Sequence, residues 1–206
     1  MTVPGYWKQA TRELSERDAV LRKIASRTHG LTLRSRGDAF NTLARSIVGQ
    51  QISVKAAASV WQKLTAAVPA VRPEVIHSHD AEALRGCGLS RGKVIYLQDL
   101  ARHFVEEKLD AGRWERMSDD ELIAELTQVR GIGRWTAEMF LIFYMTRPDV
   151  LPVDDIGLQR AMSLHYNHGR PLSKLKMRSI ARRWLPWRSV ATWYMWRSLD
   201  PIPVEY

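Results

Sequence analysis

The chain has 206 residues, 45% of them hydrophobic, which suits one domain or two closely fused lobes with a substantial core. Its 31 Lys and Arg against 22 Asp and Glu give a net charge of +9, which suits a polyanionic partner such as nucleic acid, although many other soluble proteins carry such a charge. A single cysteine, Cys87, excludes an internal disulfide and any iron–sulfur or zinc site built from several cysteines of the chain.

No stretch of the chain reaches the run of about 18 apolar residues that marks a membrane-spanning helix. The first residues lack a basic segment followed by an apolar run, so no secretory signal is predicted. The six histidines show no paired spacing with carboxylates, so no metal site built from side chains is predicted. We therefore expect a soluble, intracellular protein, in the cytoplasm or nucleoid if it is bacterial, with no cofactor and no membrane partner.

Apolar residues recur with the period of an α-helix along most of the chain, and strand-like alternation is nearly absent. The pattern predicts an all-α fold of about nine or ten helices. Asp38, Ser90 and a capping box from Ser118 to Glu121 mark helix starts, and Pro186 separates the last two helices. In chain order, the predicted helices cover residues 6–27, 39–49, 53–67, 79–85, 90–107, 118–130, 134–145, 155–165, 173–184 and 187–199.

The segment Val129–Ala137 is typical of one helix end, a tight Gly-Ile-Gly turn and the start of a second helix. Gly131 and Gly133 permit backbone conformations that other residues avoid, and they let another backbone approach closely. The N–H groups at the start of the second helix favour a phosphate, and Arg134 would add an ionic contact. The segment therefore indicates a DNA-binding hairpin, with an ordinary helix–helix turn as the alternative.

Two carboxylates, Asp154 and Asp155, follow Pro152 at the start of the next predicted helix. Pro152 disfavours helix just before the pair, and acidic residues at a helix N-terminus stabilise that helix through capping and its dipole. One of the two carboxylates is expected only to stabilise the helix in this way. Beside a phosphate-binding hairpin, the other could face the positive charge that develops on a sugar during cleavage of its bond to a base.

Four ordered segments resemble the helix-hairpin-helix (HhH-GPD) DNA glycosylase superfamily, and within it the branch typified by 3-methyladenine DNA glycosylase II. They are Ile47–Ser53, Val129–Ala137, Pro152–Asp155 and Trp184–Ser189. The resemblance implies a single domain over 1–206 with two helical lobes, one of about residues 38–184 and one of residues 1–37 plus 185–206. The base pocket would lie in the cleft between the lobes, and the β-rich N-terminal domain of some relatives is expected to be absent.

The resemblance also implies an activity. A monofunctional DNA glycosylase would hydrolyse the bond between an alkylated purine, such as 3-methyladenine or 7-methylguanine, and its sugar in damaged double-stranded DNA, for base excision repair. Asp154 is assigned as the catalytic carboxylate, with Asp155 as the runner-up. Relatives that also cleave the backbone use a lysine where this chain has Trp135, so no lyase activity is expected. A monomer is expected, because one lesion is handled at a time.

Further roles follow from the same resemblance. Trp135 and Trp196 would wall the base pocket, where electron-rich rings attract a cationic alkylbase. Gln51 would fill the space that the extruded base leaves in the duplex, with a plain surface glutamine as the alternative. The expected phosphate-binding residues are Gly131, Gly133, Arg134 and Thr136. Backbone carbonyls of the hairpin, at Val129 and Ile132, would hold a monovalent ion.

Six of the eight tryptophans have no assigned part in the chemistry. Core or helix packing is expected for Trp184, Trp187 and Trp193, and Trp7, Trp61 and Trp114 stay unassigned. Two alternatives to the function also stay open. One is an enzyme of the same fold that acts on hypoxanthine, uracil or an oxidised purine, and the other is a non-catalytic protein that binds damaged DNA.

Overall fold

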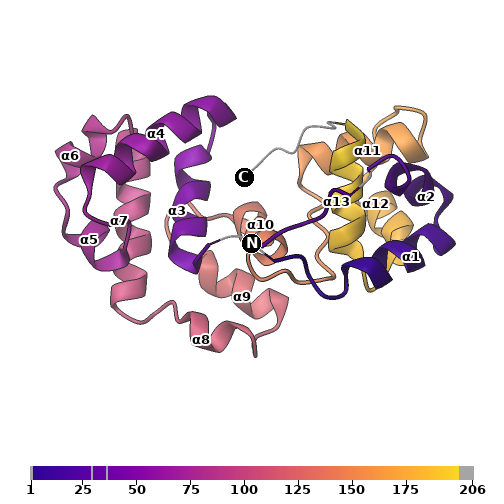
Figure 1. Ribbon diagram of the computed structural model, residues 1–206, viewed down its shortest axis with the longest axis horizontal. Coiled ribbons are helices and arrows are strands. Elements are labelled where there is room, and N and C mark those ends of the chain that lie inside the picture. The colour runs from indigo at the N-terminus through magenta and orange to yellow at the C-terminus, as the bar shows by residue number, and fades with distance from the viewer. Residues whose placement is uncertain (1, 29, 36, 200–206) are drawn as a thin grey trace. The chain divides into compact units, whose positions relative to one another are not determined.

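The structure is a computed structural model that describes residues 2–28, 30–35 and 37–199. Within these ranges every regular element is a helix, which confirms the all-α prediction, and no helix is long and apolar enough to cross a membrane. The helices are α1 (Trp7–Arg17), α2 (Ala19–Ala25), α3 (Ala39–Gly49), α4 (Val54–Ala67), α5 (Pro73–Ser78), α6 (Ala81–Gly86), α7 (Arg91–Val105), α8 (Ala111–Trp114), α9 (Asp119–Leu126), α10 (Arg134–Phe143), α11 (Ile156–Tyr166), α12 (Lys174–Ala181), the 3-10 helix η1 (Arg182–Trp184) and α13 (Arg188–Leu199) (Figure 1).

Several short helices were not predicted. The predicted helix over 6–27 is two helices, because the Asp18 carboxylate accepts the N–H groups of Val20 and Leu21 and starts α2 anew. Helix α5 begins with a proline at its first position, where the missing N–H has no acceptor in any case. Helix α8 is a single turn that the Asp110 carboxylate caps. Such short elements bury too few residues to leave a periodic pattern in the sequence.

The described residues fall into two compact units. Residues 2–28, 30–35 and 141–199 form the terminal unit, and residues 37–140 form the middle unit. The division lies inside α10, whereas the sequence analysis placed it near residue 184, so α11, α12 and η1 belong with the N-terminal helices. The chain ends that the sequence analysis assigned to the same lobe, residues 1 and 200–206, lie outside the described residues.

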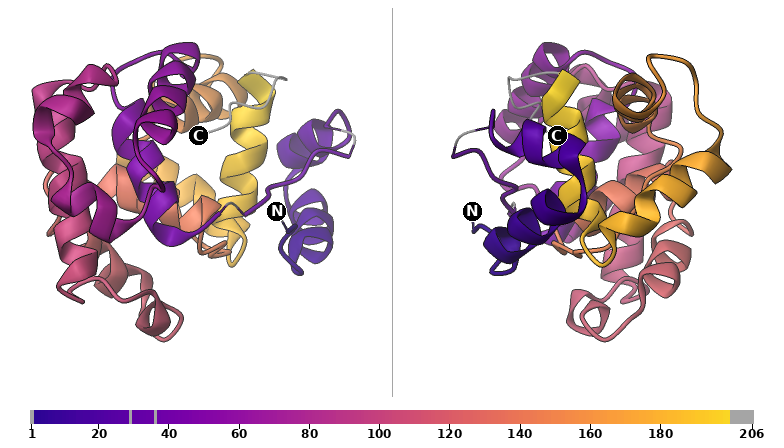
Figure 2. Two further views of the ribbon diagram at one scale, coloured as in Figure 1. Left: turned by 60° about the vertical axis from the view of Figure 1, so that its left-hand side comes forward. Right: turned by 90° about the vertical axis from the view of Figure 1, so that its right-hand side faces the viewer.

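The terminal unit is organised around Asp18, whose side chain is almost completely buried. Besides capping α2, its Oδ2 accepts the Tyr166 hydroxyl at 2.8 Å and the Trp184 Nε1–H at 3.2 Å. These bonds join α2 to the end of α11 and to η1, which explains why residues far apart in the sequence share this unit. Helices α1, α2 and α11 also pack on α13, which is the yellow helix in Figure 2.

In the middle unit, α7 packs against α3, α5 and α6. Trp114 is fully buried, with its ring edge-on to Phe104 and Phe140, and its Nε1–H donates to Glu125 at 2.8 Å. Trp61 lies under the guanidinium of Arg45, 4.7 Å from the ring centroid. Two of the unassigned tryptophans therefore contribute to packing within this unit.

The turn between α9 and α10 is built on a close contact with α7. Gly131 has φ +83°, and a Cβ at this position would lie 2.3 Å from Cδ2 of the Tyr96 ring. Two separate constraints therefore require glycine here, the left-handed backbone and the aromatic ring against it. Gly133 differs, since its backbone is outside the left-handed region and a Cβ would meet no atom within 4 Å.

Replacing Gly131 with Ala should lower the free energy of unfolding by about 2–4 kcal/mol, because the methyl group displaces the Tyr96 ring and strains the backbone. For a chain of this size that corresponds to a drop in Tm on the order of 10 °C. Calorimetry of the matched variant Gly133→Ala should show a loss below about 1 kcal/mol, the cost of a poorer helix cap. Equal Tm values for the two variants would contradict the two constraints assigned to Gly131.

Candidate functional site

The hairpin has the local geometry that the sequence predicted. The Val129 carbonyl accepts the Ile132 N–H at 3.1 Å and closes the turn. The Gly133 carbonyl accepts the Ala137 N–H at 3.1 Å, so α10 starts directly after Gly133. The first N–H groups of a helix have no acceptor within that helix, and they carry the positive end of its dipole. Gly133 is exposed, so a phosphate can approach this helix start closely.

The side chains around the hairpin contribute unequally. Arg134 is exposed, and its Nε lies 3.1 Å from the buried Glu138 carboxylate, which orients the guanidinium along α10. Thr136 is buried, so its predicted phosphate contact depends on the backbone N–H and not on the hydroxyl. The predicted ion at the carbonyls of Val129 and Ile132 stays a prediction, and no group of three or more His, Cys, Asp or Glu among the described residues could hold a metal.

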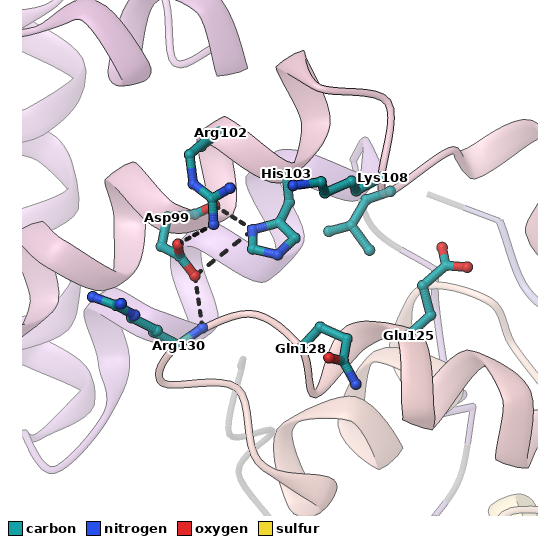
Figure 3. Close-up of a pocket in the computed structure, with 8 residues that line it drawn as sticks. Asp99, Arg102, His103, Lys108, Glu125, Gln128 and Arg130 are labelled. Carbon is teal, nitrogen blue, oxygen red and sulfur yellow. Dashed lines mark hydrogen bonds and ion pairs between the residues drawn. The ribbon is translucent and has the colours of Figure 1, made fainter.

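The residue before the turn is held by a carboxylate on α7. Asp99 accepts the Arg130 N–H at 2.9 Å and the Arg102 guanidinium at 2.7 Å, as the dashed lines of Figure 3 show. Burial acts to raise the pKa of the Asp99 carboxyl, but the bonds from Arg102 and from the Arg130 N–H outweigh it, so this pKa lies below its usual value. Asp99 therefore stays charged and keeps the hairpin attached to α7.

A polar pocket of about 410 Å³ opens beside Asp99 (Figure 3). Its lining includes Arg102, His103, Glu125 and Arg130, and no aromatic side chain other than the imidazole. Neither of the tryptophans predicted to wall the base pocket lines it. The pocket is thus a feature of the α7–hairpin junction and does not have the aromatic surface expected of a site for a cationic base.

The loop between α3 and α4 carries Gln51 at its apex. Gln51 is exposed and has φ +59°, a left-handed conformation that residues other than glycine seldom adopt. The preceding Gln50 is half-buried, and its amide Nε2 donates to the Gly131 carbonyl at 2.8 Å. The loop and the hairpin are therefore in direct contact within the middle unit, a connection that the sequence analysis did not predict.

The two adjacent carboxylates have different surroundings. Asp154 is exposed and forms an ion pair with Lys174 at the start of α12. Asp155 is buried, with 8% of its surface exposed, and caps α11 by accepting the Leu158 N–H at 2.6 Å. Its Oδ1 also accepts the Trp196 Nε1–H at 2.7 Å. A buried carboxylate fixed by two donors is pre-organised for electrostatic catalysis, whereas an exposed, paired one is not.

Trp196 approaches Asp155 closely because the chain has glycine at position 157. A Cβ on Gly157 would lie 3.1 Å from both the Asp155 Oδ1 and the Trp196 Cδ1, tighter than ordinary contacts. Trp196 also stacks on Phe143, with ring centroids 5.7 Å apart and an interplanar angle of 14°. Gly157 and Phe143 are thus functional candidates that sequence analysis missed, although the glycine in the first turn of a helix was a usable signal.

The segment that leads to Asp155 is fixed by the start of α13. Arg188 donates from Nε to one Asp149 carboxylate oxygen at 2.6 Å and from a terminal nitrogen to the other at 2.8 Å. The Ser189 hydroxyl accepts the Val150 N–H at 2.9 Å and donates to the Arg147 carbonyl at 2.6 Å. This explains why the Trp184–Ser189 segment recurs in the resemblance: it positions the chain before the candidate carboxylate.

The remaining tryptophans can now be assigned. Trp7 packs edge-on against Trp193 in the terminal unit, and Trp184 is fully buried. Trp187 is half-buried, and its Nε1–H donates to Glu13 at 2.8 Å. The packing role expected for Trp184, Trp187 and Trp193 agrees with these contacts. Trp135 is half-buried in the first turn of α10, and its predicted role in the base pocket stays a prediction.

The sequence of this chain is similar to those of known DNA repair proteins. The HhH-GPD family, described as the HhH-GPD superfamily of base excision DNA repair proteins, matches residues 44–186. DNA-3-methyladenine glycosylase 1 of Schizosaccharomyces pombe is 34% identical over 165 residues, which cover 77% of this chain and 72% of that protein. A putative DNA-3-methyladenine glycosylase of Bacillus subtilis is 30% identical over 169 residues, covering 78% of this chain and 59% of the relative.

Two solved structures share the fold. A DNA-3-methyladenine glycosidase from Bacillus halodurans gives a TM-score of 0.82 at 32% identity, with 91% of this chain and 87% of that chain covered. The 3-methyladenine DNA glycosylase of Schizosaccharomyces pombe in complex with abasic DNA gives 0.80 at 28% identity, covering 96% and 98%. With the family match over most of its length and the hairpin described above, this chain belongs to the HhH-GPD superfamily of base excision DNA repair proteins.

Proposed function

We propose that this protein is a DNA glycosylase that removes alkylated purines, such as 3-methyladenine and 7-methylguanine, from duplex DNA and leaves an abasic site. The observation that carries the proposal is the buried Asp155 carboxylate, held by the Trp196 indole and by the start of α11. The similarity to proteins named as 3-methyladenine DNA glycosylases supports the reaction class and the substrate.

Asp155 is the better candidate for the catalytic carboxylate, with Asp154 as the alternative. Hydrolysis breaks the bond between the sugar C1′ and the base nitrogen, and the bonding electrons pass to the base. The sugar then carries positive charge, which a fixed, buried carboxylate stabilises. Water bonds to C1′ as its proton passes to the carboxylate. Asp154 is less suited, because it is exposed and its charge is already paired with Lys174.

The expected substrates follow from the chemistry of the leaving group. An N-alkylated purine carries a positive charge and becomes neutral when it leaves, so no acid is needed to protonate it. Aromatic faces bind cations with about 0.5–2 kcal/mol, depending on how far the pair is removed from water. We assign Trp196 and Trp135 to base binding on this argument, which favours alkylated purines over neutral lesions such as hypoxanthine or uracil.

The proposal includes the absence of lyase activity. Cleavage of the DNA backbone by relatives uses a lysine amine that attacks the sugar and forms a Schiff base. At the corresponding position this chain has Trp135, which has no amine. Water is therefore the expected nucleophile, and the abasic site is left for another enzyme to process.

The charge distribution supports DNA as the partner. The hairpin offers exposed helix-start N–H groups and Arg134 to a phosphate. Residues 156–199 contain nine Lys and Arg and no Asp or Glu, which favours a polyanion. Gln51, at the exposed apex of its loop, is assigned to the space left by the extruded base. We further propose that the protein acts as a monomer and that it is intracellular.

The activity can be tested by incubating the protein with methylated duplex DNA and measuring released bases by chromatography. We expect release of 3-methyladenine and 7-methylguanine, with strand breaks only after alkali. Breaks without alkali would contradict the absence of lyase activity. Release of hypoxanthine or uracil at an equal rate would contradict the preference for cationic bases, and binding without any release would favour a damage-binding protein.

The two carboxylates can be distinguished by matched substitutions. Asp155→Asn should lower the rate of base release about 10²- to 10⁴-fold, because the neutral amide neither stabilises the sugar cation nor accepts the proton from water. Asn is as good a helix cap as Asp, so the Tm and the affinity for DNA should change little. Asp154→Asn should retain base release to within about fivefold, since an exposed ion pair is worth about 1 kcal/mol at most. The reverse pattern would assign catalysis to Asp154.

The hydrogen bond that the Trp196 Nε1–H donates to Asp155 can be tested separately from the aromatic face of the ring. Trp196→Phe keeps a ring beside Phe143 but removes the N–H that orients Asp155, so base release should fall about 10-fold or more. Trp187→Phe is the matched control, because it also removes an indole bond to a carboxylate, that of Glu13, in the same unit. Similar losses of activity in both variants would mean that the effect is one of general stability.

A further inference from the structure

The side-chain amide of Gln50 connects two parts of the middle unit that the proposed function treats separately. Gln50 lies directly before Gln51, in the loop that follows α3. Its Nε2 donates to the carbonyl of Gly131 at 2.8 Å, across 81 positions of the sequence. Gln51 is assigned to the space that the extruded base leaves in the duplex, and Gly131 belongs to the phosphate-binding hairpin.

The loop around Gln50 is held in an unusual conformation. Gln51 has φ +59°, and a residue other than glycine keeps such a backbone only where its surroundings impose it. One constraint is Lys93 of α7, whose Nζ donates to the Val48 carbonyl at 2.7 Å at the end of α3. Burial lowers the pKa of the Lys93 amine, and the Val48 carbonyl accepts a hydrogen bond from that amine. The Gln50 amide supplies a second constraint, directly before the apex.

Helix α7 is the common support for the loop and the hairpin. Lys93 bonds to the end of α3, where the loop begins, and Tyr96, one turn further along α7, lies against Gly131. Both segments are thus fixed to one helix and also bonded to each other through Gln50. A hydrogen bond between two segments that are already held has little conformational entropy to overcome, so it can set their spacing.

We infer that Gln50 is a positioning residue, which holds Gln51 at a fixed distance from the phosphate-binding hairpin. When the hairpin grips the backbone, Gln51 is already placed to enter the duplex, and its loop does not have to be ordered at that moment. Extruding a base costs a few kcal/mol, which an ordered plug offsets better than a loose one. This inference rests on the proposed function, because it takes the assigned roles of Gln51 and the hairpin as given.

A double-mutant cycle tests the inference. Gln50→Met keeps the length of the side chain but removes the donor, and Gln51→Ala removes the plug. The affinity is measured for a duplex with a tetrahydrofuran abasic analogue and a neighbouring 2-aminopurine, whose fluorescence reports local unstacking. We expect Gln50→Met to weaken binding about three- to tenfold, the loss expected for one hydrogen bond, and to lower the fluorescence change. In the Gln51→Ala background, Gln50→Met should have no further effect.

Two controls separate positioning from general damage. Gln128→Met removes a similar bond, from an exposed amide to the Ala124 carbonyl at 3.2 Å, close to the hairpin, and should leave the affinity unchanged. The Tm of each variant is measured, and Gln50→Ala replaces Gln50→Met if the latter does not fold.

Additive effects of the two substitutions, or no effect of a folded Gln50 variant, would overturn the inference. The assay requires no base release, so an inactive protein that still shows coupling would contradict only the proposed function. A wild-type protein that does not bind the abasic duplex would overturn both.

Discussion

The buried carboxylate of Asp18 is the interaction on which the terminal unit depends. It starts α2, and it accepts bonds from Tyr166 at the end of α11 and from Trp184 in η1. Burial and then the neighbouring Asp18 charge raise the pKa of the Tyr166 hydroxyl, so the phenol stays a donor. A charge removed from water is tolerated only when such donors satisfy it, which makes the arrangement specific as well as stable.

Helix α11 is consequently fixed at both ends by carboxylates. Asp18 holds its last residue, and Asp155 caps its first turn while accepting the Trp196 N–H. The bidentate contact of Arg188 with Asp149 fixes the chain that leads into the helix. The candidate catalytic group thus sits on a rigid element, and a charge that must act in a transition state benefits from this because little reorganisation is needed.

The middle unit uses α7 in a comparable way. Lys93, Tyr96 and Asp99 are spaced three residues apart and therefore lie along neighbouring positions of the helix surface. Lys93 bonds to the end of α3, Tyr96 lies against Gly131, and Asp99 accepts the N–H before the turn. One helix therefore supports both segments that are assigned to DNA, and the Gln50 amide joins them directly.

The sequence by itself determined the all-α class, most helix boundaries and the hairpin, because periodicity, caps and paired glycines are local signals. It also identified Asp154 and Asp155 as a pair, but their position before the same helix did not show which of the two caps it. Only the tertiary structure decided that Asp155 is buried against Trp196 while Asp154 faces Lys174. Only the tertiary structure also showed that Gln50 bonds to the Gly131 carbonyl and that Asp18 accepts the Trp184 N–H. Burial and long-range hydrogen bonds depend on which distant residues meet, and no local pattern in the chain encodes that.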